Sequence, residues 1–350
     1  FGEENVVCRN ELHDSPRNAV FLKGMDNLVE LNRIYRTMLE TSDGGAIRMC
    51  QRNPKLRGNV LRFNRILDTI GYGHPGGGYQ SPYFSWGIYL DDFTCGTTVY
   101  GNIIARTGRG AVNVHGGSDN VIENNILVDA GEYQFENNPI RPPVSGNVVR
   151  RNVFSYDGAS AHLYRCGVWL DGSVAWEKNV IDCRGAEPGL LLGMSHRIEG
   201  WQAWLAKGLE KESVLADARF VQAETDDYRL RPDAPAWKLG FTRIPVEKIG
   251  CYRSDRRASW PLQTQPEPEW EKPVLRKAPV RPLWEDFEWD LAGRPPRTGR
   301  ADGRQKSSIL ATDELAAAGK KCLKFVDSKG LYKPWYPQLS YRTKFAKGTV

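Results

Sequence analysis

Two adjacent carboxylates, Asp91 and Asp92, follow a short apolar run and are the side chains best suited to chemistry. A carboxylate pair can donate and accept protons, and it can equally hold calcium or cap a turn. Side chains alternate along a strand, so Ile88 and Leu90 are expected to point inward. Tyr89 and Asp91 then point outward, and Asp92 lies at the bend or turns inward. Asp91, which faces outward, is therefore the first candidate for a catalytic carboxylate, and Asp92 is the second.

A histidine in the next apolar segment shares the position of Asp91. His115 lies four residues after Ala111, as Asp91 lies four residues after Gly87. The outward positions two residues earlier carry Arg48, Tyr89 and Asn113. A single histidine is more often structural than catalytic, but core packing requires no His, Asp or Arg on an outward stripe. The pattern predicts a groove lined by Arg48, Tyr89, Asp91, Asn113 and His115.

These segments lie in a repeated pattern, Asn-x-[Val/Ile]-x-x-Asn, whose copies begin at Asn5, Asn27, Asn59, Thr97, Asn120, Asn147 and Val174. The spacings of 22 to 38 residues are typical of coils of a right-handed parallel β-helix, the longest containing inserted loops. Apolar segments between the copies, such as Ala46–Met49, Ala111–Val114 and Gly167–Leu170, supply further strands. Stacked coils bury a continuous core, and matched Asn side chains form hydrogen-bonded ladders. The sequence predicts an all-β fold, with a pectate-lyase-like solenoid over residues 1–250.

The C-terminal quarter differs from the repeat region. Residues 251–282 form a Pro-rich linker, and residues 283–350 are expected to start a β-sandwich-like module with a strand at Leu323–Val326. We expect this module to be truncated and the solenoid to lack N-terminal coils. A short helix is expected over Trp201–Gly208, between the last repeat and the linker.

The net charge of +6 comes entirely from residues 264–350, which hold 17 Lys+Arg and 11 Asp+Glu. The repeat region is neutral, which argues against a nucleic-acid partner. The seven Cys residues show no CxxC pair, so no metal centre is predicted from them. No apolar run approaches the roughly 20 residues that a membrane span needs.

Several runs resemble those of bacterial β-helix proteins that degrade glycans. They are His-Asp-Ser-Pro from His13, Glu40–Ile47, Trp86–Asp92, Gly96–Asn102 and the closing Tyr228–Ala236. The nearest named group is glycoside hydrolase family 141, whose members act on fucosides and xylan. The resemblance covers roughly residues 1–250. It implies a secreted or periplasmic carbohydrate-active β-helix with paired Asp residues, acting on a plant or algal polysaccharide or oligosaccharide.

The resemblance also favours Asp43 as the partner of Asp91. Glycoside hydrolysis uses two carboxylates, about 5–5.5 Å apart in retaining and about 6.5–9.5 Å apart in inverting enzymes. Asp43 precedes its strand by three residues and Asp91 follows the start of its own by four, so a fully extended chain would separate them by roughly 23 Å. The pairing therefore requires the segment before Ala46 to fold back over the groove. Asp43 is otherwise a turn residue in Ser-Asp-Gly-Gly.

The longest insertion, Gly71–Ser85, precedes Trp86 and is rich in aromatic side chains. Tyr79, Tyr83, Phe84 and Trp86 are expected to form a wall on which sugar rings stack, or else a hydrophobic plug beneath the loop. Inserted loops are common carriers of function.

Three functions fit these features. The first is a glycoside hydrolase without a cofactor, using Asp43 and Asp91 or Asp92, with Arg48 and His115 binding the substrate. The second is a polysaccharide lyase, in which Arg48 or His115 removes a proton next to a uronate carboxylate and the Asp pair holds Ca²⁺. The third is a non-catalytic glycan-binding repeat protein.

Overall fold

The computed structural model describes residues 2–75, 78–138, 144–167, 174–192 and 197–252 of the N-terminal part. Toward the C-terminus it describes residues 290, 292–296, 300–302, 308–314, 320–326 and 338–340. The chain divides into two compact units, Phe1–Leu275 and Arg276–Val350. The boundary falls inside the predicted Pro-rich linker, most of which lies outside the described residues.

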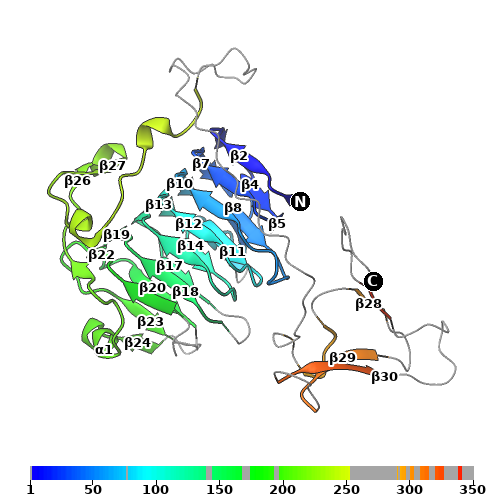
Figure 1. The fold of residues 1–350 in the computed structure, drawn as a ribbon. Coiled ribbons are helices and arrows are strands. Elements are labelled where there is room, and N and C mark those ends of the chain that lie inside the picture. Colours follow the sequence, from blue (N-terminus) through cyan, green and yellow to red (C-terminus); the bar gives the residue numbers. More distant parts are fainter. Residues whose placement is uncertain are drawn as a thin grey trace. The chain divides into compact units, whose positions relative to one another are not determined.

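The first unit is a solenoid of three parallel sheets, and each coil contributes one strand to each sheet (Figure 1). Sheet 1 contains β2 (Val6–Cys8), β6 (Leu28–Glu30), β9 (Val60–Arg62), β12 (Thr98–Tyr100), β15 (Val121–Glu123), β18 (Asn147–Arg150) and β21 (Val174–Glu177). Sheet 2 contains β3 (Glu11–His13), β7 (Arg33–Thr37), β10 (Arg65–Thr69), β13 (Ile103–Thr107), β16 (Ile126–Val128), β19 (Val153–Ser155), β22 (Val180–Asp182) and β25 (Val214–Leu215). The predicted parallel β-helix is confirmed.

Sheet 3 is the sheet that holds the predicted groove. It contains β4 (Val20–Leu22), β8 (Gly44–Cys50), β11 (Ser85–Asp91), β14 (Gly110–Val114), β17 (Tyr133–Asn137), β20 (His162–Cys166), β23 (Leu190–Leu192) and the antiparallel β24 (Arg197–Glu199). The described strand of the next coil is β20, and the segment predicted as a strand at Gly167–Leu170 lies, from residue 168 on, outside the described residues. A two-stranded sheet of β1 (Gly2–Glu3) and β5 (Gly24–Met25) adjoins the first coil.

The bend between sheets 1 and 2 explains the Asn repeat. The residue before each ladder Asn has a positive φ, as at Arg9 and Leu31, which turns the chain sharply. The side-chain amide of the Asn that follows donates to Oδ1 of the matching Asn in the next coil, over 2.9–3.2 Å. In chain order the members of this ladder are Asn10, Asn32, Asn64, Asn102, Asn125, Asn152 and Asn179. The series ends where Asn179 donates to the buried carboxylate of Glu210, 3.0 Å away. A second ladder joins the first positions of the repeat, with Thr97 interrupting it.

The interior of the solenoid is apolar, as the alternation predicts. Ile47, Met49, Ile88, Leu90 and their equivalents in neighbouring coils are fully buried in one continuous cluster. The register aligns these side chains from strand to strand in sheet 3, so each coil covers the apolar surface of the next. Burial of this surface is what holds the outward-facing residues of sheet 3 in fixed positions.

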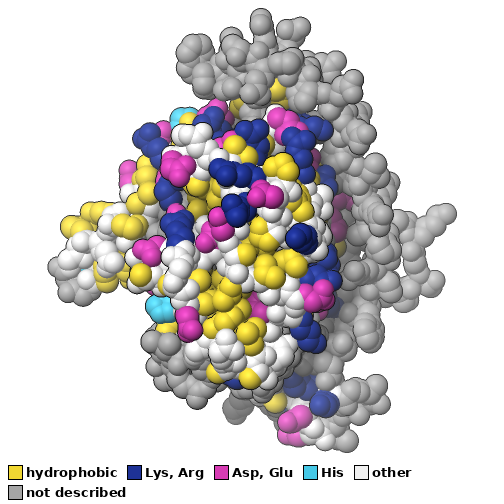
Figure 2. Space-filling model, turned by 90° about the vertical axis from the view of Figure 1, so that its left-hand side faces the viewer, with side chains coloured by type: hydrophobic (Ala, Val, Ile, Leu, Met, Phe, Trp, Pro, Cys, Tyr) yellow, Lys and Arg dark blue, Asp and Glu magenta, His cyan; other side chains and the backbone are white. Residues whose placement is uncertain are grey.

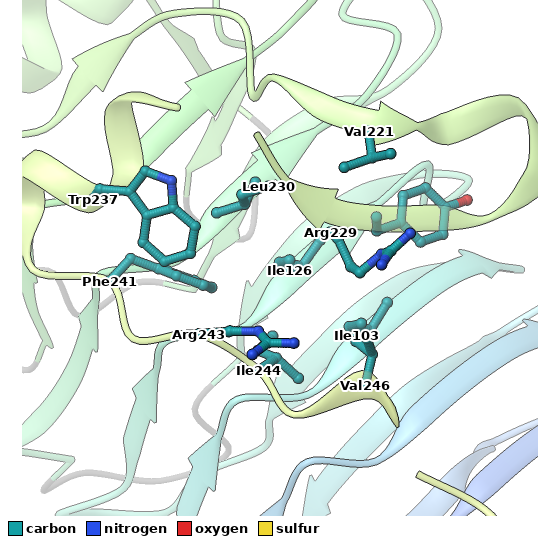
Figure 3. A pocket seen from close by; sticks show the side chains of 11 residues that line it. Ile103, Ile126, Val221, Arg229, Leu230, Trp237, Phe241, Arg243, Ile244 and Val246 are labelled. Carbon is teal, nitrogen blue, oxygen red and sulfur yellow. The ribbon is translucent and has the colours of Figure 1, made fainter. Parts of the chain in front are cut away.

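A C-terminal segment covers the outer face of sheet 2 (Figure 1). It follows the predicted helix, found as α1 (Trp201–Ala206), and contains the hairpin β26 (Phe220–Gln222) and β27 (Asp227–Leu230) and 3₁₀ turns at Ala223–Thr225, Pro235–Leu239 and Val246–Lys248. Apolar side chains of this segment pack on those of sheet 2 and enclose a cavity of about 380 Å³, lined by Ile103, Ile126, Trp237 and Phe241 among others (Figure 3). The two arginines beside it, Arg229 and Arg243, are paired with acidic neighbours. We interpret the cavity as a packing gap under this segment.

Charges on the solenoid are balanced locally as well as in total. On the face that Figure 2 shows, basic and acidic side chains are interspersed rather than separated by sign. Arg106, for example, bridges Asp68 and Asp226 and so fastens the C-terminal segment to sheet 2. This pattern agrees with the neutral repeat region read from the sequence.

The second unit is described only in part. It contains two antiparallel pairs, β28 (Arg300–Asp302) with β31 (Gln338–Ser340) and β29 (Ser308–Thr312) with β30 (Cys322–Val326). The strand predicted at Leu323–Val326 is thus present, within β30. None of the helices in the described parts of the chain is long and apolar enough to cross a membrane.

Candidate functional site

The outer face of sheet 3 carries one row of aligned polar and aromatic side chains. The strand register places the row in the order Arg48, Tyr89, Asn113, Glu136 and Arg165, one residue from each of β8, β11, β14, β17 and β20. The first three were predicted to share a groove, and they do lie side by side. Parallel strands repeat about every 4.8 Å, so each member lies against the next.

Asp91, two residues beyond Tyr89 on β11, is the centre of a buried hydrogen-bonded cluster beside this row. Arg48 donates to Asp91 Oδ2 from Nη2 at 2.5 Å and from Nε at 3.2 Å. On the other oxygen, Oδ1 accepts from His115 Nδ1 at 2.9 Å and from the Asp92 amide at 2.8 Å. The side chain is only 5% exposed. Burial alone raises the pKa of Asp91, but the hydrogen bonds from His115 and Arg48 outweigh it and lower the pKa to about 2. Asp91 is therefore ionised at any physiological pH.

Asp43 lies close to Asp91, contrary to the spacing of an extended chain. Asp43 Oδ2 is 3.9 Å from Arg48 Nη2, which is itself 2.5 Å from Asp91 Oδ2, so the two carboxylate oxygens are at most about 6.4 Å apart. The Arg48 Nη1 group also donates to the Asp43 backbone carbonyl at 2.7 Å. Asp43 itself is 58% exposed.

The reason for this proximity is a bend at the start of β8. Asp43 has a φ of +53°, and its amide donates to Phe84 in the next coil. Gly45 follows where the chain is so tightly folded that a Cβ would lie 3.0 Å from the carbonyl oxygen of Ile47. The segment before Ala46 thus folds back, as the pairing requires.

Asp92 turns away from Asp43 toward a second arginine. It has a φ of +38°, and its Oδ2 accepts from Arg52 Nε at 2.5 Å. Among the described residues, Cys50, Asp91 and Asp92 form a group whose ligand atoms lie within 4.8 Å of one another. A thiolate and two carboxylates would suit a divalent cation. Here, however, arginines pair with both carboxylates, and burial raises the pKa of Cys50 to about 11. The donor set therefore fits a metal poorly.

His115 is the accessible proton carrier of the site. Its side chain is 25% exposed, and its Nδ1 lies 2.9 Å from Asp91 and 3.4 Å from the Tyr89 hydroxyl. When Nδ1 donates to Asp91, the neutral ring presents Nε2 as the acceptor. Asp91 thus orients His115 as a base.

Three predicted substrate-binding residues are too buried for direct contact with a glycan. Tyr89, Asn113 and Trp86 are at most 3% exposed. Trp86 packs on Tyr89 with ring centroids 4.4 Å apart, and its Nε1 donates to Glu136 at 2.9 Å. The aromatic wall predicted for Trp86 is therefore wrong for this residue, which belongs to the plug under the loop. Arg48 and His115 remain the accessible predicted contacts.

Glu136 is a second buried carboxylate that the sequence analysis missed. It accepts from Trp86, from Arg109 Nε at 3.2 Å, and from Arg165. Arg109 also lies over the ring of Phe84, 4.6 Å from its centroid. A signal was present, because Glu136 follows Asn113 by 23 residues, the same spacing as between Asn102 and Asn125.

The site therefore holds one ionised buried carboxylate, one exposed carboxylate nearby, a histidine oriented as a base and an arginine shared between the carboxylates. These groups can exchange protons with a bound substrate and stabilise developing charge.

Comparisons with known proteins bear on the fold. Searches among curated proteins and among solved structures give no match. A family model described as the right handed beta helix region matches residues 2–184, which is more than half of the chain. Together with the three parallel sheets, this match shows that the chain belongs to the right-handed β-helix family.

Proposed function

We propose that the protein is a carbohydrate-active enzyme, a glycoside hydrolase that cleaves a plant or algal polysaccharide or its side chains. The observation that carries the proposal is the approach of Asp43 and Asp91 to within about 6.4 Å on the outer face of sheet 3. A separation below about 6.5 Å fits retaining hydrolysis, which uses about 5–5.5 Å, better than inversion.

The environments of the two carboxylates suggest their roles. Asp91 is held ionised by Arg48 and His115 but its side chain is only 5% exposed, which suits a group that stabilises positive charge on the sugar without attacking it. Asp43 is exposed on the surface, where it can reach a glycosidic oxygen or a water molecule. Arg48 contacts both carboxylates, and its positive charge offsets their mutual repulsion. This division of labour follows the rule that paired carboxylates in different environments take different roles.

The test measures release of reducing sugar from a panel of plant and algal polysaccharides. Asp43→Asn and Asp91→Asn are each expected to lower turnover by at least about 100-fold, the size of a lost acid–base or charge-stabilising group. Asp119→Asn is the matched control, since Asp119 is an exposed Asp paired with Arg57 outside the site. Full activity of Asp91→Asn in a folded protein would remove Asp91 from the mechanism.

A second candidate function is β-elimination by a polysaccharide lyase. The specific observation in its favour is the Asp91–His115 pair, which leaves Nε2 of the partly exposed His115 as a base. A lyase product contains an unsaturated bond that absorbs in the ultraviolet, whereas a hydrolase product does not. Ultraviolet-absorbing products that disappear in His115→Gln, with Asp43→Asn still active, would favour the lyase over the hydrolase.

A further inference from the structure

The insertion between β10 and β11 carries an exposed aromatic cluster that the site described above does not use. Tyr79 is 74% exposed, the largest value among the described aromatic side chains. Its ring stacks on Tyr72 at 5.3 Å with an interplanar angle of 16°, and His74 meets it edge-on at 4.8 Å. Tyr72, His74 and Tyr79 are called the aromatic platform below.

The platform is held in place before any ligand binds. Gly73 and Gln80 exchange two backbone hydrogen bonds of 3.1 and 2.9 Å, which join the two limbs of the insertion. The stacked rings have thus already given up rotational freedom that a flexible surface tyrosine would lose on binding. Tyr79 nevertheless remains largely exposed to solvent.

The platform adjoins the segment that carries Asp43. The Tyr72 amide donates to the Thr41 carbonyl at 3.0 Å, and a Cβ on Gly73 would lie 3.3 Å from Ser42 Oγ. Asp43 follows Thr41 by two residues, which span at most about 7 Å. The hydrogen bond to Thr41 therefore holds Tyr72 close to Asp43. A glycan cut beside Asp43 would extend over this loop.

The chemistry of the insertion favours an uncharged sugar. Between Asp68 and Asp91 the sequence contains no Asp, Glu, Lys or Arg, although charged residues make up 26% of the chain. The exposed groups of its described residues include the rings of Tyr72, His74 and Tyr79 and the uncharged polar side chains of Gln80 and Ser81. Such groups pack on the apolar face of a pyranose and hydrogen-bond its hydroxyls, but they offer no fixed positive charge to a uronate.

We infer that the aromatic platform is a sugar-binding subsite for a neutral pyranose, next to Asp43. The inference rests on the proposed function, because it places a neighbouring sugar of the same glycan chain on Tyr79. It narrows the substrate class to neutral polysaccharides and so counts against the lyase.

The experiment measures binding of the full chain to soluble xylan and xyloglucan, and to polygalacturonate and alginate, by affinity electrophoresis. We expect binding to at least one neutral polymer and about a 10-fold loss of affinity in Tyr79→Ala, with Tyr79→Phe close to the parent because the ring is kept. Phe325→Ala is the matched control, since Phe325 is a similarly exposed ring on β30 of the second unit, 53% exposed. Unchanged thermal unfolding shows that Tyr79→Ala is folded.

Affinity of Tyr79→Ala equal to that of the parent overturns the inference, as does binding confined to the uronate polymers or binding to none of the four. The outcome is separate from that of the proposed function. Turnover that survives Asp43→Asn and Asp91→Asn refutes the catalytic pair, whereas binding that depends on Tyr79 still supports the subsite.

Discussion

Replacing Arg48 by methionine tests whether Asp91 is held ionised by its partners. The pKa of Asp91 falls from the ordinary value of 3.8 to about 2, which corresponds to roughly 2.4 kcal/mol at about 1.36 kcal/mol per pH unit. His115 shares this stabilisation with Arg48. Arg48→Met also leaves a buried charge short of a partner, which costs about 3–5 kcal/mol in fully buried pairs. Because Arg48 is 14% exposed, we expect a loss of about 2–3 kcal/mol in the free energy of unfolding at pH 7.

The pH dependence gives the sign of the effect. Because the folded pKa of Asp91 is depressed, its contribution is complete above about pH 4 and is lost as the pH falls through about 2. In Arg48→Met, burial pushes the pKa of Asp91 upward. Protonation of Asp91 at low pH then removes the buried charge that lacks its arginine partner. The difference in unfolding free energy between parent and variant should therefore narrow as the pH falls from about 5 toward 2.

The assay is urea unfolding followed by tryptophan fluorescence at several pH values. Arg57→Met is the control, because Arg57 pairs with the exposed Asp119 and should cost less than about 1 kcal/mol. In the double variant with Asp91→Asn, the Arg48 substitution should cost much less than it does alone. The reasoning is refuted if Arg48→Met lowers the free energy of unfolding by less than about 0.5 kcal/mol at pH 7. It is also refuted if the difference between parent and Arg48→Met is the same at pH 3 and pH 7.

Two further predictions concern the fold. Asn102→Ala should lower the free energy of unfolding by about 3 kcal/mol or more, because buried polar groups in two neighbouring coils lose their hydrogen-bond partner. Asn53→Ala, in a surface turn, is the control and should change the free energy of unfolding little in the same urea titration. Gly87→Ala should lower the free energy of unfolding by about 1–3 kcal/mol, because the added Cβ would lie 2.3 Å from Ile104 Cγ2. The Cβ added in Gly78→Ala meets nothing within 4 Å, so this control should keep the parent's melting temperature. Equal melting temperatures of the two variants would contradict the prediction.

The architecture could be predicted from the sequence because each coil repeats the same local sequence pattern. An Asn at each bend and an alternating apolar strand recur often enough that Asn102 and Ile88 identify their neighbours by spacing alone. The strand at Tyr133–Asn137 escaped detection because it lacks the small apolar residues of the other copies. The C-terminal segment over sheet 2 has no repeat, and its packing depends on tertiary contacts.

The candidate site was predictable where the strands are regular and not where they bend. Alternation correctly places Arg48, Tyr89 and Asp91 on the outer face. The bend at Gly45 brings Asp43 back to Arg48, which no spacing rule for extended strands anticipates. At Gly87 the Cβ position faces the interior beside Ile104, as Ile88 does, so the alternation shifts and Trp86 packs on the outer face.

The main Asn ladder has a direction. Each ladder Asn donates a hydrogen bond to the Asn of the next coil and accepts one from the Asn of the coil before. The ionised carboxylate of Glu210 can only accept, so it fixes the direction of donation along the whole ladder. Because the rungs are interchangeable, a whole coil can be added or removed before Glu210 without stranding any amide. Evolution can therefore lengthen or shorten such a solenoid in steps of one strand spacing, about 4.8 Å, and with it the extent of the outer face of sheet 3.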